Sequence, residues 1–213
     1  MVDLADIRKE YTQGRLDETT CADNPLVQFH AWFEQYRDSN PPEPTIMTVA
    51  SVDEQGQPWQ RILLLKGYDE HGFVFFTNFN SNKGQQLQAN HKASLHFFWI
   101  EMERQIQIQG EVEKISRQQA EQYFHSRPRE SQLGAWASAQ SQPLDNRQQL
   151  EDQFADVSRR YEGQQVPLPE HWGGFRLKPQ RMEFWQGGAH RLHDRVEYLR
   201  QTEDDWCKQR LNP

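Results

Sequence analysis

The chain has 213 residues, of which 35% are hydrophobic and 12% aromatic, and its formal net charge is −7. This length is enough to bury a core, and the aromatic share argues against a disordered chain. The acidic balance excludes a globally basic surface for nucleic acid, so we expect no nucleic-acid partner. Any anionic ligand must be held by local clusters of Arg and Lys.

Export, membrane insertion and a structural metal all lack a signal in the sequence. The N-terminal residues have no apolar segment of the kind found in signal peptides, and the longest aliphatic run, Ile62 to Leu65, is far too short to span a bilayer. Cys21 and Cys207 stand apart, without the paired spacing of a zinc or redox site. We therefore expect a cytoplasmic protein without a membrane partner.

The first predicted elements are an arm, a helix and a meander of strands. Residues 1–24 are polar and are expected to form a mobile N-terminal arm. Apolar residues at helical spacing predict a helix over 25–38, which the proline-rich segment 40–44 ends. A second helix is predicted over 81–90, with Ser81 as its N-cap. Strands are predicted at 45–52, 59–66, 73–77, 92–100 and 104–115.

The second half of the chain returns from helices to strands. Helices are predicted at 117–125, 128–139 and 145–162, with Ser126 as a cap and Pro128 as the start of the middle one. Strands are predicted at 172–178, 181–186, 193–200 and 205–211. Antiparallel strands joined by short turns must hide their edges, and closure into a barrel does so. We therefore predict an α+β fold, mainly antiparallel β, as one barrel domain over 25–213 with flanking helices.

The segment R-I-L-L-L-K is the first candidate for ligand binding. Side chains alternate along a strand, so Arg61 points with Leu63 and Leu65, whereas Lys66 points with Ile62 and Leu64. If both cations bind anions, they bind different ones. The alternative is a strand whose charged ends lie at the rim of the sheet.

The segment T-N-F-N-S-N-K lies at a predicted strand-to-helix junction. A helix N-terminus offers free N–H groups and the positive end of the helix dipole. Thr77, Ser81 and Lys83 add two hydroxyls and an ammonium, which together predict a phosphate cradle. Ordinary capping by Ser81 is the alternative.

The segment Y-F-H-S-R-P-R-E-S places three polar side chains four residues apart, namely Tyr123, Arg127 and Ser131. A phenol, a guanidinium and a hydroxyl near a helix start can hold a phosphate monoester. The alternative is a solvated helix hairpin with its charged residues outside.

The segment W-Q-G-G-A-H-R-L-H-D-R combines a glycine turn with a dense cationic cluster. Gly187 and Gly188 permit a tight turn or a close backbone approach. A metal site is an alternative, because two histidines follow three residues apart. Asp194 is the only nearby carboxylate, however, and the arginines would repel a cation, so no metal is expected. The cluster consists of His190, Arg191, His193 and Arg195.

The order of these motifs closely resembles that of the pyridoxine/pyridoxamine 5′-phosphate oxidases. After R-I-L-L-L-K come F-T-N, S-N-K, E-R-Q, Y-F-H-S-R-P-R-x-S-Q-L-G-A-W, Q-S, W-G-G-F-R, W-Q-G-G-x-H-R-L-H-D-R and R-L-x-P, and the arm contains R-K-E-Y. The resemblance covers nearly the whole chain, and the long W-Q-G-G motif is specific to the family. It implies a split β-barrel homodimer with FMN at the subunit interface.

The resemblance also implies roles for single residues. The implied FMN contacts are Arg61, Ile62, Leu63, Leu64, Leu65, Lys66, Phe76, Thr77, Asn82, Lys83, Gln105, Gln140, Ser141, Trp185 and Arg195. The implied substrate contacts are Lys66, Tyr123, Arg127 and Ser131 at the phosphate, Arg191, Leu192 and His193 at the pyridine ring, and Arg8 and Tyr11 as a cover.

Two positions depart from the family pattern. Asn82 stands where the family often has Arg, so one cationic contact to the FMN phosphate is expected to be missing. A charge-assisted hydrogen bond contributes roughly 1.5–3 kcal/mol, which corresponds to about tenfold or more in FMN affinity. Phe76 lacks a phenol, so only its backbone or ring can contribute.

The implied activity is the oxidation of pyridoxine 5′-phosphate and pyridoxamine 5′-phosphate by dioxygen to pyridoxal 5′-phosphate, with release of hydrogen peroxide, in vitamin B6 biosynthesis and salvage. We expect a hydride to pass from the carbon attached to pyridine C4 to flavin N5. Arg191 and His193 are the expected catalytic residues. Two alternatives stay open: another split-barrel flavoprotein of the flavin reductase kind, and a non-catalytic binder of flavin or pyridoxal phosphate.

Overall fold

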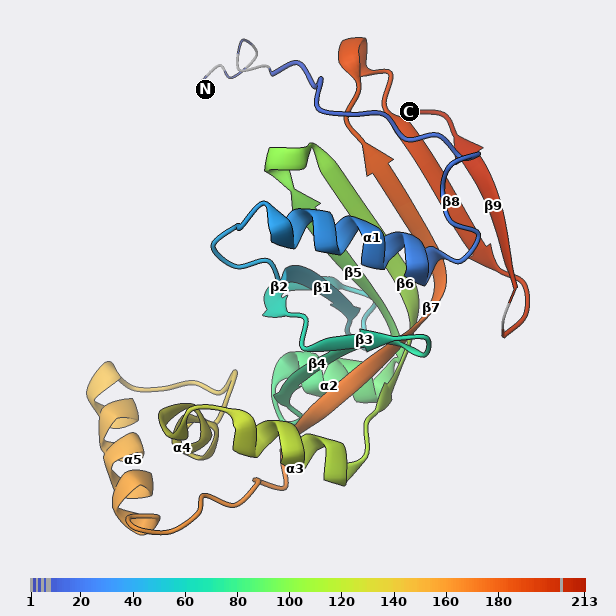
Figure 1. Ribbon diagram of the computed structural model, residues 1–213. Helices are drawn as coiled ribbons and strands as arrows, with labels where there is room; N and C mark the ends of the chain where they lie inside the picture. Colours follow the sequence, from blue (N-terminus) through green and yellow to red (C-terminus); the bar gives the residue numbers. More distant parts are fainter. Residues whose placement is uncertain (1, 3, 5, 7–8, 204) are drawn as a thin grey trace.

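The computed structural model describes residues 2, 4, 6, 9–203 and 205–213 (Figure 1). Within this part of the chain nine strands form one antiparallel sheet, in the order β2-β1-β5-β6-β7-β4-β3, with β8 beside β7 and β9 beside β8. The strands are β1 (Ile46–Val52), β2 (Pro58–Leu64), β3 (Gly67–Asp69), β4 (Gly72–Asn78), β5 (Lys92–Trp99), β6 (Arg104–Lys114), β7 (Trp172–Gln186), β8 (Asp194–Arg200) and β9 (Trp206–Leu211).

Five α-helices flank this sheet in the described residues. They are α1 (Pro25–Asp38), α2 (Asn82–Ala89), α3 (Arg117–Ser126), α4 (Arg129–Ala137) and α5 (Arg147–Arg160), with short 3-10 segments η1 (Ile100–Met102) and η2 (Ala189–Arg191). The sheet curls, α1 lies across it, and α3, α4 and α5 gather at the end opposite to β8 and β9 (Figure 1). The predicted α+β, mainly antiparallel fold is confirmed. None of the described helices is both long enough and apolar enough to cross a membrane.

The main core forms where α1 covers the curled sheet. Asn24 caps this helix by accepting the N–H of Leu26, and Pro25 opens its first turn. The fully buried ring of Phe29 then meets Phe73 and Phe97 edge to face, with centroids 4.8 and 5.3 Å apart. Aromatic pairs in this arrangement stabilise the core beyond the area that they bury. The helix predicted over 25–38 is therefore confirmed with its bounds.

A second apolar cluster attaches α3, α4 and α5 to the beginning of β7. Its centre is Phe124, and Trp172 packs against it at 5.3 Å. The cap predicted at Ser126 is wrong. This residue ends α3 and donates its hydroxyl to the carbonyl of Tyr123, and α4 begins after Pro128 without a side-chain cap.

Strand β7 corrects the prediction of two strands at 172–178 and 181–186, because the structure has one continuous strand there. Pro179 cannot donate a ladder hydrogen bond, and in the sequence it indicates a break. A bulge opposite Gln109 and Gly110 absorbs the irregularity while pairing with β6 continues on both sides. Gly110 is required there, because an added Cβ would lie 1.9 Å from the carbonyl oxygen of Lys178.

We predict that Gly110→Ala lowers the free energy of unfolding by about 1–3 kcal/mol, because the new methyl group collides with backbone that cannot move freely. Gly67→Ala is the matched control, since a Cβ on this strand residue meets nothing within 4 Å. The measurement is the urea midpoint of both variants against wild type. Equal midpoints for the two variants would contradict the role assigned to the bulge.

Candidate functional site

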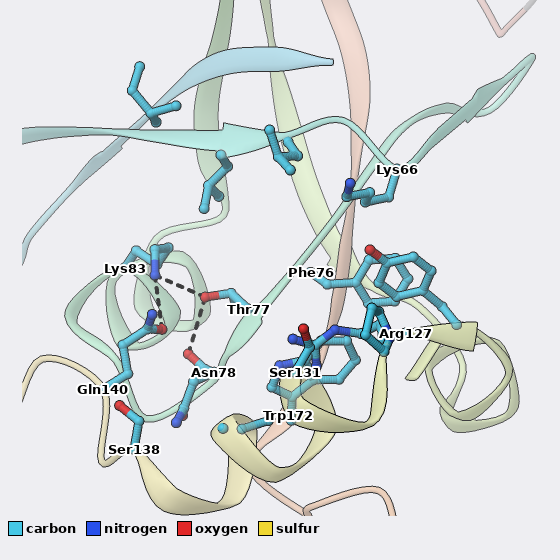
Figure 2. A pocket seen from close by; sticks show the side chains of 17 residues that line it. Lys66, Phe76, Thr77, Asn78, Lys83, Arg127, Ser131, Ser138, Gln140 and Trp172 are labelled. Carbon is cyan, nitrogen blue, oxygen red and sulfur yellow. Dashed lines mark hydrogen bonds between the residues drawn. The ribbon is translucent and has the colours of Figure 1, made fainter. Parts of the chain in front are cut away.

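A cavity of about 690 Å³ opens between β2, β4, α3, α4 and the start of β7 (Figure 2). We call it the cationic cavity, because Lys66, Lys83 and Arg127 line it while its described lining contains no Asp or Glu. The chain as a whole carries a net charge of −7. This local reversal of sign favours an anionic ligand.

Lys83 forms one end of the cationic cavity. Ser81 caps α2 as predicted, accepting the N–H of Gly84 at 3.2 Å, and this turn directs Lys83 inward. The Lys83 ammonium donates to Thr77 Oγ1 at 3.0 Å and to Gln140 Oε1 at 3.1 Å (Figure 2). Burial, together with the nearby charge of Arg61, lowers the Lys83 pKa to about 8. A buried ammonium with neutral partners is arranged to bind an anion.

The two cations of R-I-L-L-L-K have different surroundings. Lys66 lines the cationic cavity. The Arg61 guanidinium donates to Ser51 Oγ at 2.7 Å and to Gln86 Oε1 at 3.2 Å, beside α2. Strand β2 ends at residue 64, two residues earlier than predicted, and Leu65 turns into the core with 3% exposure.

Arg127 forms the other end of the cavity, against a stack of rings. Phe76 stacks on Tyr123 with centroids 3.9 Å apart and on Trp172 at 5.3 Å. The guanidinium carbon of Arg127 lies 4.7 Å from the Trp172 ring, and its Nη1 is buried without a hydrogen-bond partner in the described structure. Burial lowers the Arg127 pKa. An orphaned buried donor costs free energy until an acceptor arrives, and Ser131 lines the cavity beside it.

Four residues of the implied FMN set lie outside the lining of the cationic cavity on this side, and one of them is Arg61, whose contacts are given above. Asn82 lines a separate hollow with Asp53 and Trp59, so the departure from the family pattern lies away from the cavity. Ser141 follows Gln140 in a left-handed conformation, with φ of 70°. Leu65 is the fourth. The members that do line the cavity are Ile62, Leu63, Leu64, Lys66, Phe76, Thr77, Lys83 and Gln140.

A second group of predicted residues forms one row across three strands. Gln105 on β6 is paired with Trp185 on β7, which is paired with Arg195 on β8. Directly opposite residues of antiparallel strands share a face, so the three side chains lie together. Arg195 donates to the buried Glu183 at 2.8 Å, and this hydrogen bond, more than the opposing effect of burial, raises the Arg195 pKa.

The turn between β7 and β8 carries the remaining predicted residues. His190 and Arg191 have φ angles of 56° and 62°, so two consecutive side chains adopt the left-handed conformation. The backbone N–H of Gly188 donates to Nδ1 of His193 at 3.2 Å, so a neutral His193 carries its proton on Nε2. Burial and the charge of Arg191 lower the His193 pKa. Leu192 is 70% exposed.

The N-terminal arm closes a second cavity, of about 480 Å³, over this turn. Tyr11 lines it together with Arg191 and His193, and also packs 5.7 Å from the Trp185 ring. Arg8, the other predicted cover residue, lies outside the described residues. We call the row and the turn together the loop group, which comprises Gln105, Trp185, Arg191, His193 and Arg195.

The structure separates the cationic cavity from the loop group. Trp172 at one end of β7 lines the cavity, and Trp185 near the other end belongs to the loop group. Thirteen strand residues cover roughly 40 Å, and Figure 1 shows the β7–β8 turn at the end of the molecule opposite to α3 and α4. One chain therefore does not bring the predicted residues into a single site.

Sequence reasoning assigned no role to several residues that line the cationic cavity. Gly134 and Ala135 lie within Q-L-G-A-W, and Trp172 begins W-G-G-F-R, so the quoted motifs contained the signal. Asn78, Pro128 and Ser138 line the cavity as well. These three residues shape the wall of the cavity, and their placement there depends on tertiary packing.

The comparisons with known proteins agree along the whole chain. Residues 34–161 match the family model described as pyridoxamine 5′-phosphate oxidase, and residues 172–213 match the pyridoxine 5′-phosphate oxidase C-terminal dimerisation region. The chain is 52% identical to the pyridoxine/pyridoxamine 5′-phosphate oxidase of Pseudoalteromonas translucida, over 99% of each chain. It is 51% identical to the protein of the same name from Synechocystis, over 100% of this chain and 99% of that one.

Two solved structures share the fold. PhzG from Burkholderia lata, in complex with tetrahydrophenazine-1-carboxylic acid, superposes with a TM-score of 0.86 at 27% identity, covering 92% of this chain and 96% of that one. A pyridoxamine 5′-phosphate oxidase-related, FMN binding protein from Nostoc punctiforme superposes with a TM-score of 0.72, covering 90% and 100%; at 17% identity it supports the fold alone.

The Lys83 pKa of about 8 predicts that anion binding in the cationic cavity weakens at alkaline pH. Sulfate is a suitable probe, because its own charge stays constant in this range. Above pH 8 its affinity should fall about tenfold per pH unit, since only the protonated ammonium attracts it. Calorimetric titration between pH 7 and 9.5 measures this.

Lys83→Met is the matched control for that titration. It should bind sulfate more weakly at pH 7 and show no loss of affinity centred on pH 8. A wild-type affinity that stays constant up to pH 9.5 would contradict the assignment of Lys83 as an anion ligand.

Proposed function

This chain belongs to the pyridoxine/pyridoxamine 5′-phosphate oxidase family, and we propose that it holds FMN and substrate together between two copies of itself. Its reaction is the oxidation of pyridoxine 5′-phosphate and pyridoxamine 5′-phosphate by dioxygen to pyridoxal 5′-phosphate, with release of hydrogen peroxide. We assign the activity to the cytoplasm, because Cys21 and Cys207 are free thiols, as is usual in reducing compartments.

The observation that carries the proposal is the presence of two distinct cationic ends in one cavity. Lys83, with Thr77 and Gln140, fits the phosphate of FMN. Arg127, with its orphaned Nη1, fits the phosphate of the substrate. Neither cation is neutralised by a carboxylate of the described lining, so two phosphates compensate the cost of burying them.

FMN held by Lys83, Thr77 and Gln140 would supply the redox chemistry, namely hydride uptake from the substrate and electron transfer to dioxygen. Within the loop group, Arg191 and His193 orient the pyridine ring, whereas Gln105, Trp185 and Arg195 are the FMN contacts. Because the Gly188 N–H occupies Nδ1 of His193, the neutral imidazole presents an Nε2–H donor to an acceptor on that ring. Arg191 brings a permanent positive charge to the same turn. Burial lowers the His193 pKa most, and this positive charge lowers it further, so both keep His193 neutral.

A second copy supplies the loop group to the cationic cavity of the first. Within one chain, roughly 40 Å of strand separates the cationic cavity from the loop group. FMN and the substrate are too small to reach across that distance. Ile62 beside the cavity and Phe98 beside Gln105 are 60% and 50% exposed, as expected of apolar side chains that a partner covers. The match to a dimerisation region over residues 172–213 supports this arrangement.

The purified protein should show the absorption bands of oxidised flavin, bleached by pyridoxamine 5′-phosphate when oxygen is excluded. Oxygen uptake with peroxide production should follow when oxygen is admitted, and NADH should not replace the substrate. A colourless protein that takes up no added FMN would overturn the cofactor proposal. Turnover with NADH alone would favour a flavin reductase.

Mixing two inactive variants tests whether two copies share each site. Arg127→Ala damages the cationic cavity, and Arg191→Ala damages the loop group, so each variant alone should lose at least about a hundredfold in kcat/KM. A mixed dimer combines the intact cavity of one chain with the intact loop group of the other. Co-expression should therefore restore about a quarter of wild-type activity, because half of the dimers are mixed and each has one good site. No recovery in a purified mixed dimer would contradict the shared site.

A further inference from the structure

The motif E-R-Q at the start of β6 contains a glutamate outside both the cationic cavity and the loop group. Glu103 follows η1 with a φ of 53°, in the left-handed conformation, and its side chain is only 1% exposed. A buried carboxylate in a strained backbone position is held there by specific partners. Those partners lie about ninety residues earlier in the chain, in the N-terminal arm.

Glu103 binds the arm through both carboxylate oxygens. Its Oε2 accepts the backbone N–H groups of Thr12 at 2.7 Å and Gln13 at 3.0 Å. Its Oε1 lies 3.1 Å from the Lys9 ammonium. Burial acts to raise the Glu103 pKa, but the donors at Gln13, Lys9 and Thr12 outweigh it and hold the pKa below its usual value. The carboxylate is therefore ionised at neutral pH and binds the arm with charge-assisted hydrogen bonds.

The same residue also holds the start of the β7–β8 turn. The backbone carbonyl of Glu103 accepts the N–H of Gly187 at 2.7 Å. A Cβ on Gly187 would lie 2.8 Å from the Tyr11 side chain and 3.1 Å from Glu103 Cβ, so only glycine lets the arm approach this closely. Tyr11 thereby packs 5.8 Å from the His193 ring and forms a wall of the second cavity.

We propose that Glu103 is a positioning residue for the substrate: its carboxylate fixes the N-terminal arm so that Tyr11 closes the pyridine side of the site. This inference rests on the proposed function for its substrate, but the anchoring itself does not. Without the carboxylate, the N–H groups of Thr12 and Gln13 lose their acceptor and donate to water instead. Tyr11 then leaves His193, while the cationic cavity and its FMN contacts stay unchanged.

Three variants separate anchoring from folding. Glu103→Asn replaces the carboxylate with a shorter, uncharged side chain that cannot reach the arm. The left-handed backbone tolerates the change, because Asn is enriched in that conformation. Glu103→Gln keeps an acceptor for the two amides and loses the ion pair with Lys9. Glu113→Asn is the matched control, because it breaks an exposed ion pair, 2.7 Å from Lys178, elsewhere on β6.

Amide hydrogen exchange at Thr12 and Gln13 gives a readout that does not depend on activity. Glu103→Asn should speed exchange at both amides by about tenfold or more, since two charge-assisted hydrogen bonds are lost. Glu103→Gln should have an intermediate effect, and Glu113→Asn should have none. Unchanged exchange in Glu103→Asn overturns the proposal, whatever the enzyme's activity.

Steady-state kinetics then connects the anchor to the substrate. Glu103→Asn should raise KM for pyridoxamine 5′-phosphate about fivefold, with kcat within about twofold and FMN content unchanged, because the arm holds bound substrate and leaves the chemistry intact. In a Tyr11→Ala background the same substitution should add nothing further. Additive effects in the double variant overturn the proposal. A wild-type protein that oxidises no substrate refutes the proposed function instead, while the exchange experiment still tests the anchor.

Discussion

The continuous pairing of β7 with β6 is the constraint on which the rest of the structure depends. One strand carries Trp172 into the cationic cavity and Trp185 into the loop group, and hydrogen bonding along its length keeps these two ends apart. A flexible linker could fold back and bring them together, but a paired strand cannot. The bulge at Gly110 preserves this rigidity across Pro179, where the ladder would otherwise stop. This separation within one chain is the physical basis of our proposal that two chains together complete the site.

Burying Lys83 and Arg127 in the cationic cavity costs free energy that an anionic ligand can offset. Lys83 is buried among neutral oxygens, and Arg127 keeps a buried donor without a partner among the described residues. Moving a charged group out of water is unfavourable unless an opposite charge meets it. In our proposal a ligand phosphate supplies that charge, so its binding would also stabilise this end of the fold. Specificity for phosphorylated ligands would follow from the same cost, because a neutral ligand leaves the buried charges uncompensated.

Local sequence signals predicted the parts of the site that are built locally. Capping by Ser81 and the inward turn of Lys83 follow from a strand that runs directly into a helix. Two features could not be read this way. Pro179 indicated a break because the pairing that continues on both sides of the β7 bulge is made with another strand, β6. Asn82, one of the implied FMN contacts, lines a hollow separate from the cationic cavity in the single chain. The separation of the loop group from the cavity depends on the register of the whole sheet, which no short motif encodes.

The three consecutive residues of the E-R-Q segment contact three different parts of the molecule: the arm, the helix that covers the core and the row beside Trp185. Glu103 lies before the strand and points to the arm. Once β6 begins, side chains alternate. Arg104 turns inward, where its guanidinium lies 4.3 Å from the Trp32 ring and its Nε donates to Gln186, and Gln105 turns to the opposite face, into the row beside Trp185. The start of β6 thus contacts the helix that covers the core, the row beside Trp185 and the arm. Because the Glu103 carboxylate accepts the N–H groups of Thr12 and Gln13 while its backbone carbonyl accepts that of Gly187, the position of the arm is coupled to the sheet and to the turn that it covers.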